Sequence, residues 1–263
     1  VLCSILPEHV ISAPDVDFIY QVPLNFEKEN LGNKILKHFG LRSRSQDLRN
    51  WRKLASSIRR AKKEVRIGIV GKYFETGDFI LTDAYISVIE AIKHACWQNR
   101  VKPQITWLSS EKYVKSPQAA RELKNFDGVI VPGGFGTRGI EGKMKASEIC
   151  RTNNIPYLGL GFGMQLAVIE FAKNVCGLKN AASTEFSPAN TIEPIIDVMP
   201  DQKALLKEKR YGGTMRLGAY PCRVQKGTVA FRAYGKTMIS ERHRHRYELN
   251  NEYRALLEKK GMV

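Results

Sequence analysis

Continuous apolar runs alternate with helical patterns over the middle of this chain, from Val65 to Val175. The first run reads VRIGIVG, and the later ones read PQITWLSS, FDGVIVPGGFG and PYLGLG. The segments between them carry apolar residues at helical spacing, as in IEGKMKASEICRTN. Strands that are apolar on both faces and alternate with helices form parallel sheets covered on both sides. The sequence therefore predicts an α/β fold with a mostly parallel central sheet and helices on both faces.

The helical patterns between these runs are expected to pack on the sheet. In the second of them, Ser116 is expected to cap the helix, with Pro117 just inside it. In the first, the predicted buried face consists of Tyr85, Val88, Ile89, Ile92 and Ala95. The predicted helices span residues 80–99, 116–125, 140–153 and 163–175.

After Ser183 this alternation stops. The remaining apolar runs are short and read EPIIDVM, GTMRLGAYPCRV, GTVAFRAY and ISERHRHRYEL. Short runs separated by turn residues favour antiparallel strands, so we expect an antiparallel extension of the sheet. A closing helix is predicted for residues 252–260.

A strongly basic segment precedes the first strand. Residues 41–64 read LRSRSQDLRNWRKLASSIRRAKKE, in which Trp51, Ala55 and Ile58 recur at helical spacing. We interpret the segment as a linker helix that docks on a neighbouring domain through Trp51 and Ile58. A nucleic-acid-binding arm is the alternative, but no aromatic stacking pattern or groove-reading motif accompanies the basic residues.

Charge and cysteine usage narrow the class of protein. The net charge of +16 indicates an anionic partner such as a nucleotide, a nucleic acid or an acidic protein surface. The five cysteines are odd in number and lack CxxC spacing, which favours reduced thiols and a cytoplasmic location. No run is long enough to cross a bilayer, so we expect no membrane partner. The chain starts without Met, and we expect it to be part of a longer protein.

Residues 157–165, which read YLGLGFGMQ, place a glycine at every second position between a strand and a helix. A phosphate-binding loop is one interpretation, but GxGxG is one residue shorter than the dinucleotide motif. A nucleophile elbow is the other, with Gly161 at its tip and positive φ there. Gly159 and Gly163 would then let strand and helix pack closely, and the Phe162 amide would help to hold an oxyanion. From these residues alone, an elbow and a plain tight turn remain equally open.

The longer segment YLGLGFGMQLAVIEFAKN resembles the nucleophile segment of triad-type (class I) glutamine amidotransferases, and in detail that of the CTP synthase family. Similar segments run along nearly the whole chain and read DVDFIYQVPL, VRIGIVGKY, VPGGFGTRGIEGK, STEFSP, GGTMRLG and ERHRHRYELN. The resemblance implies three parts. They are the C-terminal end of a synthetase domain at 1–40, a linker helix at 41–64 and a glutaminase domain at 65–263.

The resemblance also implies an activity. A glutaminase domain of this kind hydrolyses the side-chain amide of glutamine through a cysteine thioester. The ammonia then serves a synthetase domain, which uses ATP and Mg²⁺ to convert UTP into CTP. The family pattern implies no cofactor and no metal in the glutaminase domain, GTP as an activator, and a homotetramer of the full-length enzyme.

Gly161 stands at the position of the family's nucleophile, where cysteine is expected. Glu185 suits the ammonium group of glutamine, and Arg246 suits its carboxylate through a forked hydrogen-bonded pair. Backbone amides near Gly134 and Phe162 would form the oxyanion hole. The glutamine contacts that the resemblance implies are Gly134, Phe162, Gly163, Met164, Gln165, Glu185 and Arg246.

Two departures from the family pattern lead us to expect a chain that binds glutamine without hydrolysing it. Gly161 removes the thiol, and no other cysteine lies at a comparable turn. The family's base comes from an HPE segment, and none of the five histidines is followed by that pattern. Loss of both groups abolishes thioester chemistry. A catalytically dead, amidotransferase-like binding or regulatory module is the alternative function.

The run from Arg242 to Arg246 alternates arginine with histidine. His243 and His245 would share one face of a strand, as two metal ligands could. The arginines would repel a cation, however, and no cysteine or carboxylate completes a ligand set. We therefore interpret the arginines as an anion-binding feature.

Overall fold

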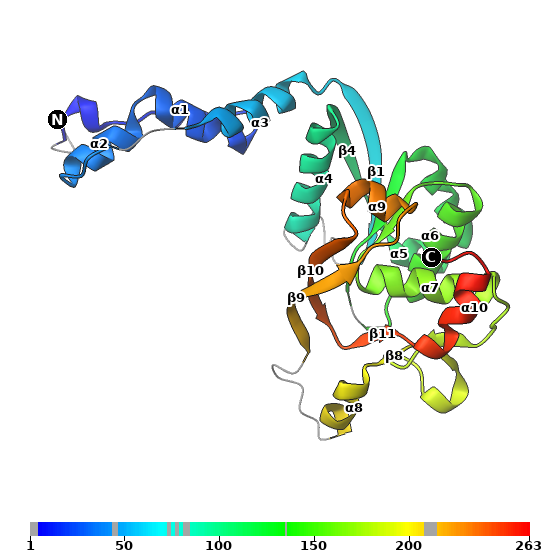
Figure 1. The fold of residues 1–263 in the computed structure, drawn as a ribbon. Coiled ribbons are helices and arrows are strands. Elements are labelled where there is room, and N and C mark those ends of the chain that lie inside the picture. Colours follow the sequence, from blue (N-terminus) through cyan, green and yellow to red (C-terminus); the bar gives the residue numbers. More distant parts are fainter. Residues whose placement is uncertain are drawn as a thin grey trace. The chain divides into compact units, whose positions relative to one another are not determined.

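The computed structural model describes residues 5–43, 47–72, 75–76, 79–80, 85–134, 136–207 and 215–263. Contacts between Cα atoms divide the chain into two compact units, whose elements are labelled in Figure 1. The first unit comprises Val1–Val65 and Ser87–Gln104, and the second comprises Arg66–Ile86 and Ile105–Val263. The assignment of residues 1–40, 41–64 and 65–263 to named domains stays a prediction.

The first unit is built from helices. The predicted basic helix is present as α3, Arg49–Arg60, and buries Ala55. The indole Nε1 of Trp51 donates a hydrogen bond to the carbonyl oxygen of Tyr20 at 2.6 Å. Trp51 therefore anchors the helix to Tyr20 within this unit, and docking on a neighbouring domain stays a prediction. The other α-helices that belong wholly or mainly to it are α1 (Val22–Lys28), α2 (Leu31–His38) and α4 (Ile86–Gln98).

Helix α4 differs from the expected helix at 80–99. Ile80 lies in the short strand β3, Phe79–Ile80, which pairs with β2, Glu75–Thr76, and residues 81–84 lie outside the described part. Ile89 and Ile92 are buried as expected, but Ala95 is exposed. Cys96 and Trp97 are buried instead, because the ring of Trp97 packs edge-on against that of Tyr20, with 5.5 Å between centroids.

The central sheet of the second unit has four strands in the order β4-β1-β5-β6. Strand β5 (Gly128–Val131) pairs in parallel with both β1 (Lys63–Gly71) and β6 (Tyr157–Gly159), while β4 spans Val101–Ser109. This confirms the predicted α/β class with a parallel central sheet. Because β1, β5 and β6 are parallel, their carboxyl ends meet at one edge, where the glycine-rich segments begin.

Two of the predicted helices follow strands of this sheet closely. They are α6, Ile140–Thr152, and α7, Phe162–Asn174. The segment at 116–125 is instead a 3-10 helix, Pro117–Asn125, preceded by the short helix α5, Ser110–Lys115. The expected capping bond from the Ser116 side chain is absent, and the Ser116 carbonyl oxygen accepts the Ala119 N–H at 2.9 Å, which closes the first turn. None of the described helices is both long and apolar enough to cross a membrane.

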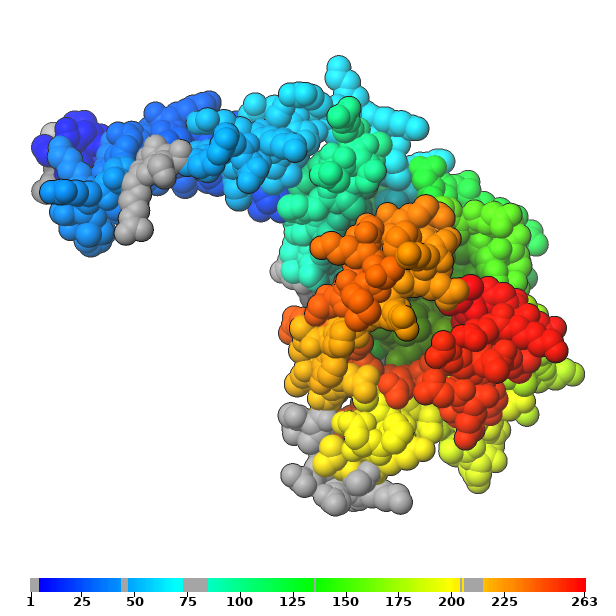
Figure 2. Space-filling model, in the orientation of Figure 1, coloured from blue at the N-terminus to red at the C-terminus, as the bar shows by residue number. Residues whose placement is uncertain are grey.

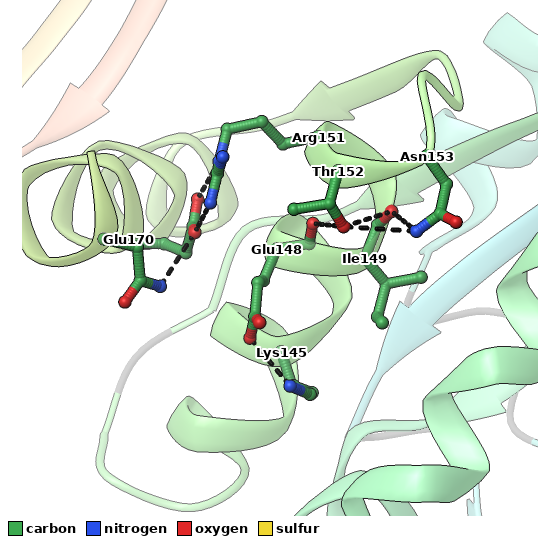
Figure 3. Close-up of polar contacts among 8 residues, drawn as sticks. Lys145, Glu148, Ile149, Arg151, Thr152, Asn153 and Glu170 are labelled. Carbon is green, nitrogen blue, oxygen red and sulfur yellow. Dashed lines mark hydrogen bonds and ion pairs between the residues drawn. The ribbon is translucent and has the colours of Figure 1, made fainter.

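An ion pair between a partly exposed arginine and a buried carboxylate joins α6 to α7. Arg151 donates two hydrogen bonds to the Glu170 carboxylate, from Nε at 3.1 Å and from Nη2 at 2.6 Å (Figure 3). Asn174 donates a third at 2.9 Å. Leu166 and Ile169 of α7 belong to one buried apolar cluster with residues of β8 and α10. Helix α7 is therefore held both by the ion pair and by this cluster.

The C-terminal part contains two small sheets. In the first, β8 (Glu193–Val198) pairs antiparallel with β11 (Tyr247–Leu249), as expected for the segment after Ser183, and parallel with β7 (Ala181–Ser183), a short strand that was not predicted. The second is the antiparallel pair of β9, Arg216–Arg223, and β10, Met238–His245. Helices α8, Pro200–Lys207, and α10, Arg254–Lys259, complete this part.

The segment GTVAFRAY forms a helix, α9 (Val229–Tyr234), where a strand was expected. The hydroxyl of Thr228 accepts the Phe231 N–H at 3.1 Å and so caps the first turn. Gly235 ends the helix in the left-handed conformation, with φ of 66°. A cap and a terminating glycine outweigh the strand propensity of the apolar residues.

Candidate functional site

Gly161 occupies the junction between β6 and α7. Its φ of 50° and ψ of −110° place it in a conformation that side-chain-bearing residues rarely adopt. A Cβ atom built on Gly161 would meet no atom within 4 Å. The chain therefore has the strained, outward-facing tip that is typical of a nucleophile elbow.

The glycines two residues before and after the tip are required for a different reason. A Cβ atom on Gly159 would lie 2.5 Å from the backbone nitrogen of Met164. A Cβ atom on Gly163 would overlap the carbonyl oxygen of Val131. Both positions need glycine because strand and helix backbones approach closely there, as the elbow interpretation predicted.

Three hydrogen bonds hold the elbow in place. The Tyr157 hydroxyl donates to the carbonyl oxygen of Gly163 at 2.9 Å. The Leu160 N–H donates to the carbonyl oxygen of Val131 at 2.9 Å, and the Gln165 N–H donates to that of Gly161 at 3.0 Å. Burial raises the pKa of Tyr157, so its hydroxyl stays a neutral donor. The tip is thus tied to both neighbouring strands.

The glycine loop after β5 lies beside this tip and donates a hydrogen bond to Glu185, which follows β7. A Cβ atom on Gly133 would be 3.7 Å from the carbonyl oxygen of Leu160. The backbone N–H of Gly136 donates to the half-buried Glu185 carboxylate. Burial raises the pKa of Glu185, and the Gly136 N–H and the nearby Lys72 ammonium partly oppose that shift.

An aromatic contact links the elbow to the Glu185 segment. The ring of Phe162, directly after the tip, packs edge-on against that of Phe186, with 6.4 Å between their centroids. Gly134 is half-buried in the glycine loop, and Met164 is 44% exposed on the first turn of α7. The structure therefore places the predicted residues of the loop, the tip and the Glu185 segment together.

Arg246 is linked to the elbow helix through its neighbour in the chain, Tyr247. The side chain of Gln165 donates to the carbonyl oxygen of Tyr247 at 3.1 Å, which ties the segment after β10 to the elbow helix. The Arg246 side chain is buried, and its Nη1 donates to Oε1 of Gln202 at 2.9 Å. Gln202 thus holds one end of the Arg246 guanidinium, and the role of Arg246 as a ligand for a carboxylate stays a prediction.

The two histidines of β10 contact each other. His243 Nδ1 and His245 Nε2 are 2.9 Å apart, and His245 Nδ1 lies 3.0 Å from the carbonyl oxygen of Tyr247. Because that carbonyl can only accept, His245 carries its proton on Nδ1 and His243 donates to it. Burial is the main cause that lowers the pKa of His245. The part of the chain that the structure describes contains no cluster of three or more metal-ligating side chains.

Two buried lysines were not predicted. Lys72, just after β1, is 6% exposed, and its Nζ lies 3.5 Å from the carbonyl oxygen of Gly136. Lys143, on α6, is fully buried. A lysine in a sequence normally indicates an exposed position, so no pattern in the chain pointed to either residue.

The free thiols lie away from the elbow. Cys96 is on α4, Cys150 on α6, Cys176 just after α7 and Cys222 on β9, while Cys3 lies outside the described residues. Burial raises the pKa of Cys150 to about 12 and also raises that of Cys96 and Cys176. Raised pKa values keep these thiols protonated and weakly nucleophilic.

A cavity of about 1030 Å³ opens between the β9–β10 hairpin and the C-terminal segment. Figure 2 shows this hollow between the orange and red segments. Its lining includes Arg223, Lys226 and Arg254 but none of the predicted site residues. The elbow remains the candidate site, because the backbone geometry and the polar groups converge there.

Residues 80–262 match the family model described as glutamine amidotransferase class-I. The chain belongs to the class I glutamine amidotransferase family. A solved structure similar to this amidotransferase is the glutaminase domain of Trypanosoma brucei CTPS with bound acivicin. That structure is 37% identical, with a TM-score of 0.66, and the match covers 75% of this chain and 72% of that chain.

Two curated relatives of this amidotransferase carry the name CTP synthase. The one from Caldanaerobacter subterraneus subsp. tengcongensis is 49% identical over 261 residues, which are 99% of this chain and 47% of the relative. The one from Methanocaldococcus jannaschii is 48% identical over 266 residues, 99% of this chain and 48% of the relative. The chain thus spans about half the length of these relatives, and the resemblance to the CTP synthase family is confirmed.

Proposed function

We propose that this amidotransferase binds glutamine at the elbow, as the glutaminase part of a CTP-forming enzyme. With glycine at position 161 it would bind glutamine without forming a covalent bond. The observation that carries the proposal is the backbone of Gly161. It has the strained conformation and the open space that a nucleophile needs, and it lies between two glycines that have no such space.

The groups around the elbow suit a zwitterionic amino acid. The Glu185 carboxylate would pair with the ammonium group of glutamine, and the Arg246 guanidinium would pair with its carboxylate. The side-chain amide would then lie over Gly161. Its carbonyl oxygen would face backbone amides near Gly134 and Phe162, which would stabilise negative charge on that oxygen.

Hydrolysis through this geometry needs a thiolate at the tip. The thiolate would attack the amide carbon, the C–N bond would break, and ammonia would leave with a proton from a general acid. Water would then cleave the thioester to give glutamate and restore the thiol. Gly161 supplies no sulfur for the first of these steps, so glutamine would stay bound and intact.

Titration calorimetry with glutamine and a glutamate assay test the proposal. The chain is expected to bind glutamine and to release no glutamate. A Gly161→Cys variant is expected to react with an electrophilic glutamine analogue, and glutamine should protect it. Gly177→Cys is the matched control, because Gly177 also has positive φ and open space but lies after α7. Glutamate release by the unaltered chain, or equal labelling of both variants, would contradict the proposal.

The ammonia would serve a synthetase domain that uses ATP, Mg²⁺ and UTP. GTP would activate the enzyme, which would be a cytoplasmic homotetramer. In a protein of the relatives' full length, added ammonia should support CTP formation with glycine at position 161. Glutamine should support it only after the Gly161→Cys change. Gly161 also favours a second candidate, a regulatory glutamine-binding module. In that case glutamine would change the rate of the ammonia-dependent reaction.

A further inference from the structure

Lys143 is a buried cation whose charge the proposed chemistry does not yet use. Its side chain is fully buried, and its Nζ lies 3.5 Å from the carbonyl oxygen of Pro132. The same ammonium lies 5.6 Å from the centroid of the Phe162 ring. Among the residues that the structure describes, no carboxylate forms an ion pair with Lys143. An ammonium group buried without a counter-charge is costly, so its presence needs an explanation.

The two contacts of Lys143 are with the two segments that flank the tip. Pro132 begins the glycine loop, and Phe162 directly follows Gly161. The Pro132–Gly133 peptide is trans, so its C=O and N–H point in opposite directions. With the carbonyl oxygen directed at Lys143, the Gly133 N–H is directed away from the lysine. Lys143 therefore contacts the first peptide of this loop on its carbonyl side.

The charge of Lys143 can stabilise a nearby anion, which an apolar side chain cannot do. A methionine would fill similar space and avoid the cost of burying an ammonium group. A positive charge in a water-poor region stabilises a nearby anion far more than it would in water. The anion expected at this elbow is a thiolate or an oxyanion at position 161. The site would thus gain from the lysine only when negative charge forms there.

We propose that Lys143 is a positioning residue of the elbow. It orients the Pro132–Gly133 peptide through its hydrogen bond, and its buried charge favours an anion at position 161. This proposal rests on the proposed function only in placing a nucleophile position at Gly161. Lys143 contacts Phe162 and the glycine loop, so it acts through them and through its electric field.

The charge is present at neutral pH and is lost in mildly alkaline solution. Burial lowers the pKa of Lys143 to about 8, and repulsion from Lys72 adds to this shift. Below that pH the ammonium favours an anion at the tip. Above it the neutral amine keeps the contact with Pro132 but no longer provides the field.

The test uses the Gly161→Cys variant and the rate of alkylation by iodoacetamide between pH 6 and pH 10. This reaction reports the thiolate fraction and needs no glutamine. Adding Lys143→Met is expected to slow alkylation at pH 7 about five- to tenfold, which corresponds to a rise of about one unit in the thiol pKa. Adding Lys143→Gln should slow it similarly, because glutamine can still donate to Pro132 but has no charge.

Lys145→Met is the matched control, because Lys145 lies on the same helix and pairs with Glu148 at 2.8 Å. It should leave the alkylation rate unchanged. Equal rates with and without Lys143 would overturn the proposal, as would a Lys145→Met effect of the same size. Circular dichroism checks that each variant folds. If neither Lys143 variant folds, the pH dependence of the alkylation rate of the Gly161→Cys variant decides. Besides the titration of the thiol, a second step near pH 8 is expected from Lys143. A profile with a single step would overturn the proposal.

The two proposals can fail separately. Glutamine calorimetry on the Lys143→Gln chain tests whether the binding pocket is intact. Binding without any change in thiol reactivity would refute the role of Lys143 and leave the proposed function standing. A Lys143-dependent thiol in a chain that never binds glutamine would refute the proposed function instead.

Discussion

A side chain on Gly163 would overlap the carbonyl oxygen of Val131, because the first turn of α7 lies directly against the end of β5. The same carbonyl oxygen accepts the N–H of Leu160 at 2.9 Å, so it cannot move away freely. Gly161, two residues earlier, has open space but an unfavourable backbone conformation. The flanking glycine is therefore required for packing, and the tip glycine only relieves strain.

The two glycines should respond differently to alanine. Gly161→Ala is expected to lower the free energy of unfolding by about 1–3 kcal/mol, the cost of a strained φ. Gly163→Ala should cost about 3 kcal/mol or more, since backbone atoms must shift to make room. Urea denaturation measures both, with Gly177→Ala as a control for positive φ alone. A Gly163→Ala variant as stable as Gly161→Ala would contradict the close approach of α7 and β5.

Glutamine affinity should depend on pH through Glu185. Burial holds the pKa of this carboxyl above its usual value, and only the ionised form can pair with an ammonium group. Affinity should therefore rise with pH up to the pKa of Glu185 and level off above it, and binding below that pKa should release a proton. Calorimetry between pH 4.5 and pH 8 measures this.

Glu185→Gln should bind weakly at every pH in this range and lose the pH dependence. The matched control is Glu141→Gln, because Glu141 is exposed in the first turn of α6. If Glu185→Gln kept both the affinity and its pH dependence, Glu185 would not be the ligand of the ammonium group.

Glutamine binding should depend on the Arg246 guanidinium and on the hydrogen bond from Arg246 to Gln202. Arg246→Lys loses the forked geometry and should weaken glutamine binding about 10- to 100-fold. Gln202→Ala removes the acceptor that holds Nη1 at 2.9 Å and should weaken binding about three- to tenfold. The controls are Arg244→Lys, on the exposed part of β10, and Lys203→Ala, beside Gln202. An unchanged Kd in both test variants would contradict a role for Arg246.

The ion pair between α6 and α7 should matter for stability rather than for binding. Glu170 is 2% exposed and Arg151 about a third exposed, so Arg151→Met should cost about 2–3 kcal/mol by leaving a buried carboxylate with only Asn174 (Figure 3). The double variant Arg151→Met/Glu170→Met should recover part of that loss. The control is Arg254→Met, whose pair with Glu258 is exposed and should contribute less than about 0.5 kcal/mol. If Arg151→Met and Arg254→Met lowered the free energy of unfolding equally, this account would be contradicted.

The errors of the sequence-based expectations have local physical causes. GTVAFRAY alternates well enough for a strand, but the Thr228 cap and Gly235 favour one short helix. Strand β7 was missed because three residues carry too little pattern, and its parallel pairing with β8 depends on the chain turning back between them. The periodicity of apolar residues thus predicted the long elements correctly. In the short segments, residues at the ends of an element, such as the Thr228 cap and Gly235, decided between helix and strand.

The amino-acid order by itself determined the parallel sheet, through apolar strands that must be buried on both faces. The glycines at alternate positions left an elbow and a plain tight turn open, and the resemblance to the amidotransferase segment favoured the elbow. Apolar runs and glycine spacing are local features of the chain, so a sequence pattern records them. Only the tertiary structure decided that the buried Lys143 ammonium lies over the Phe162 ring and that Gln202 supports Arg246. Residues far apart in the chain make these contacts, and the desolvation that gives them their effect exists only once the elements have packed.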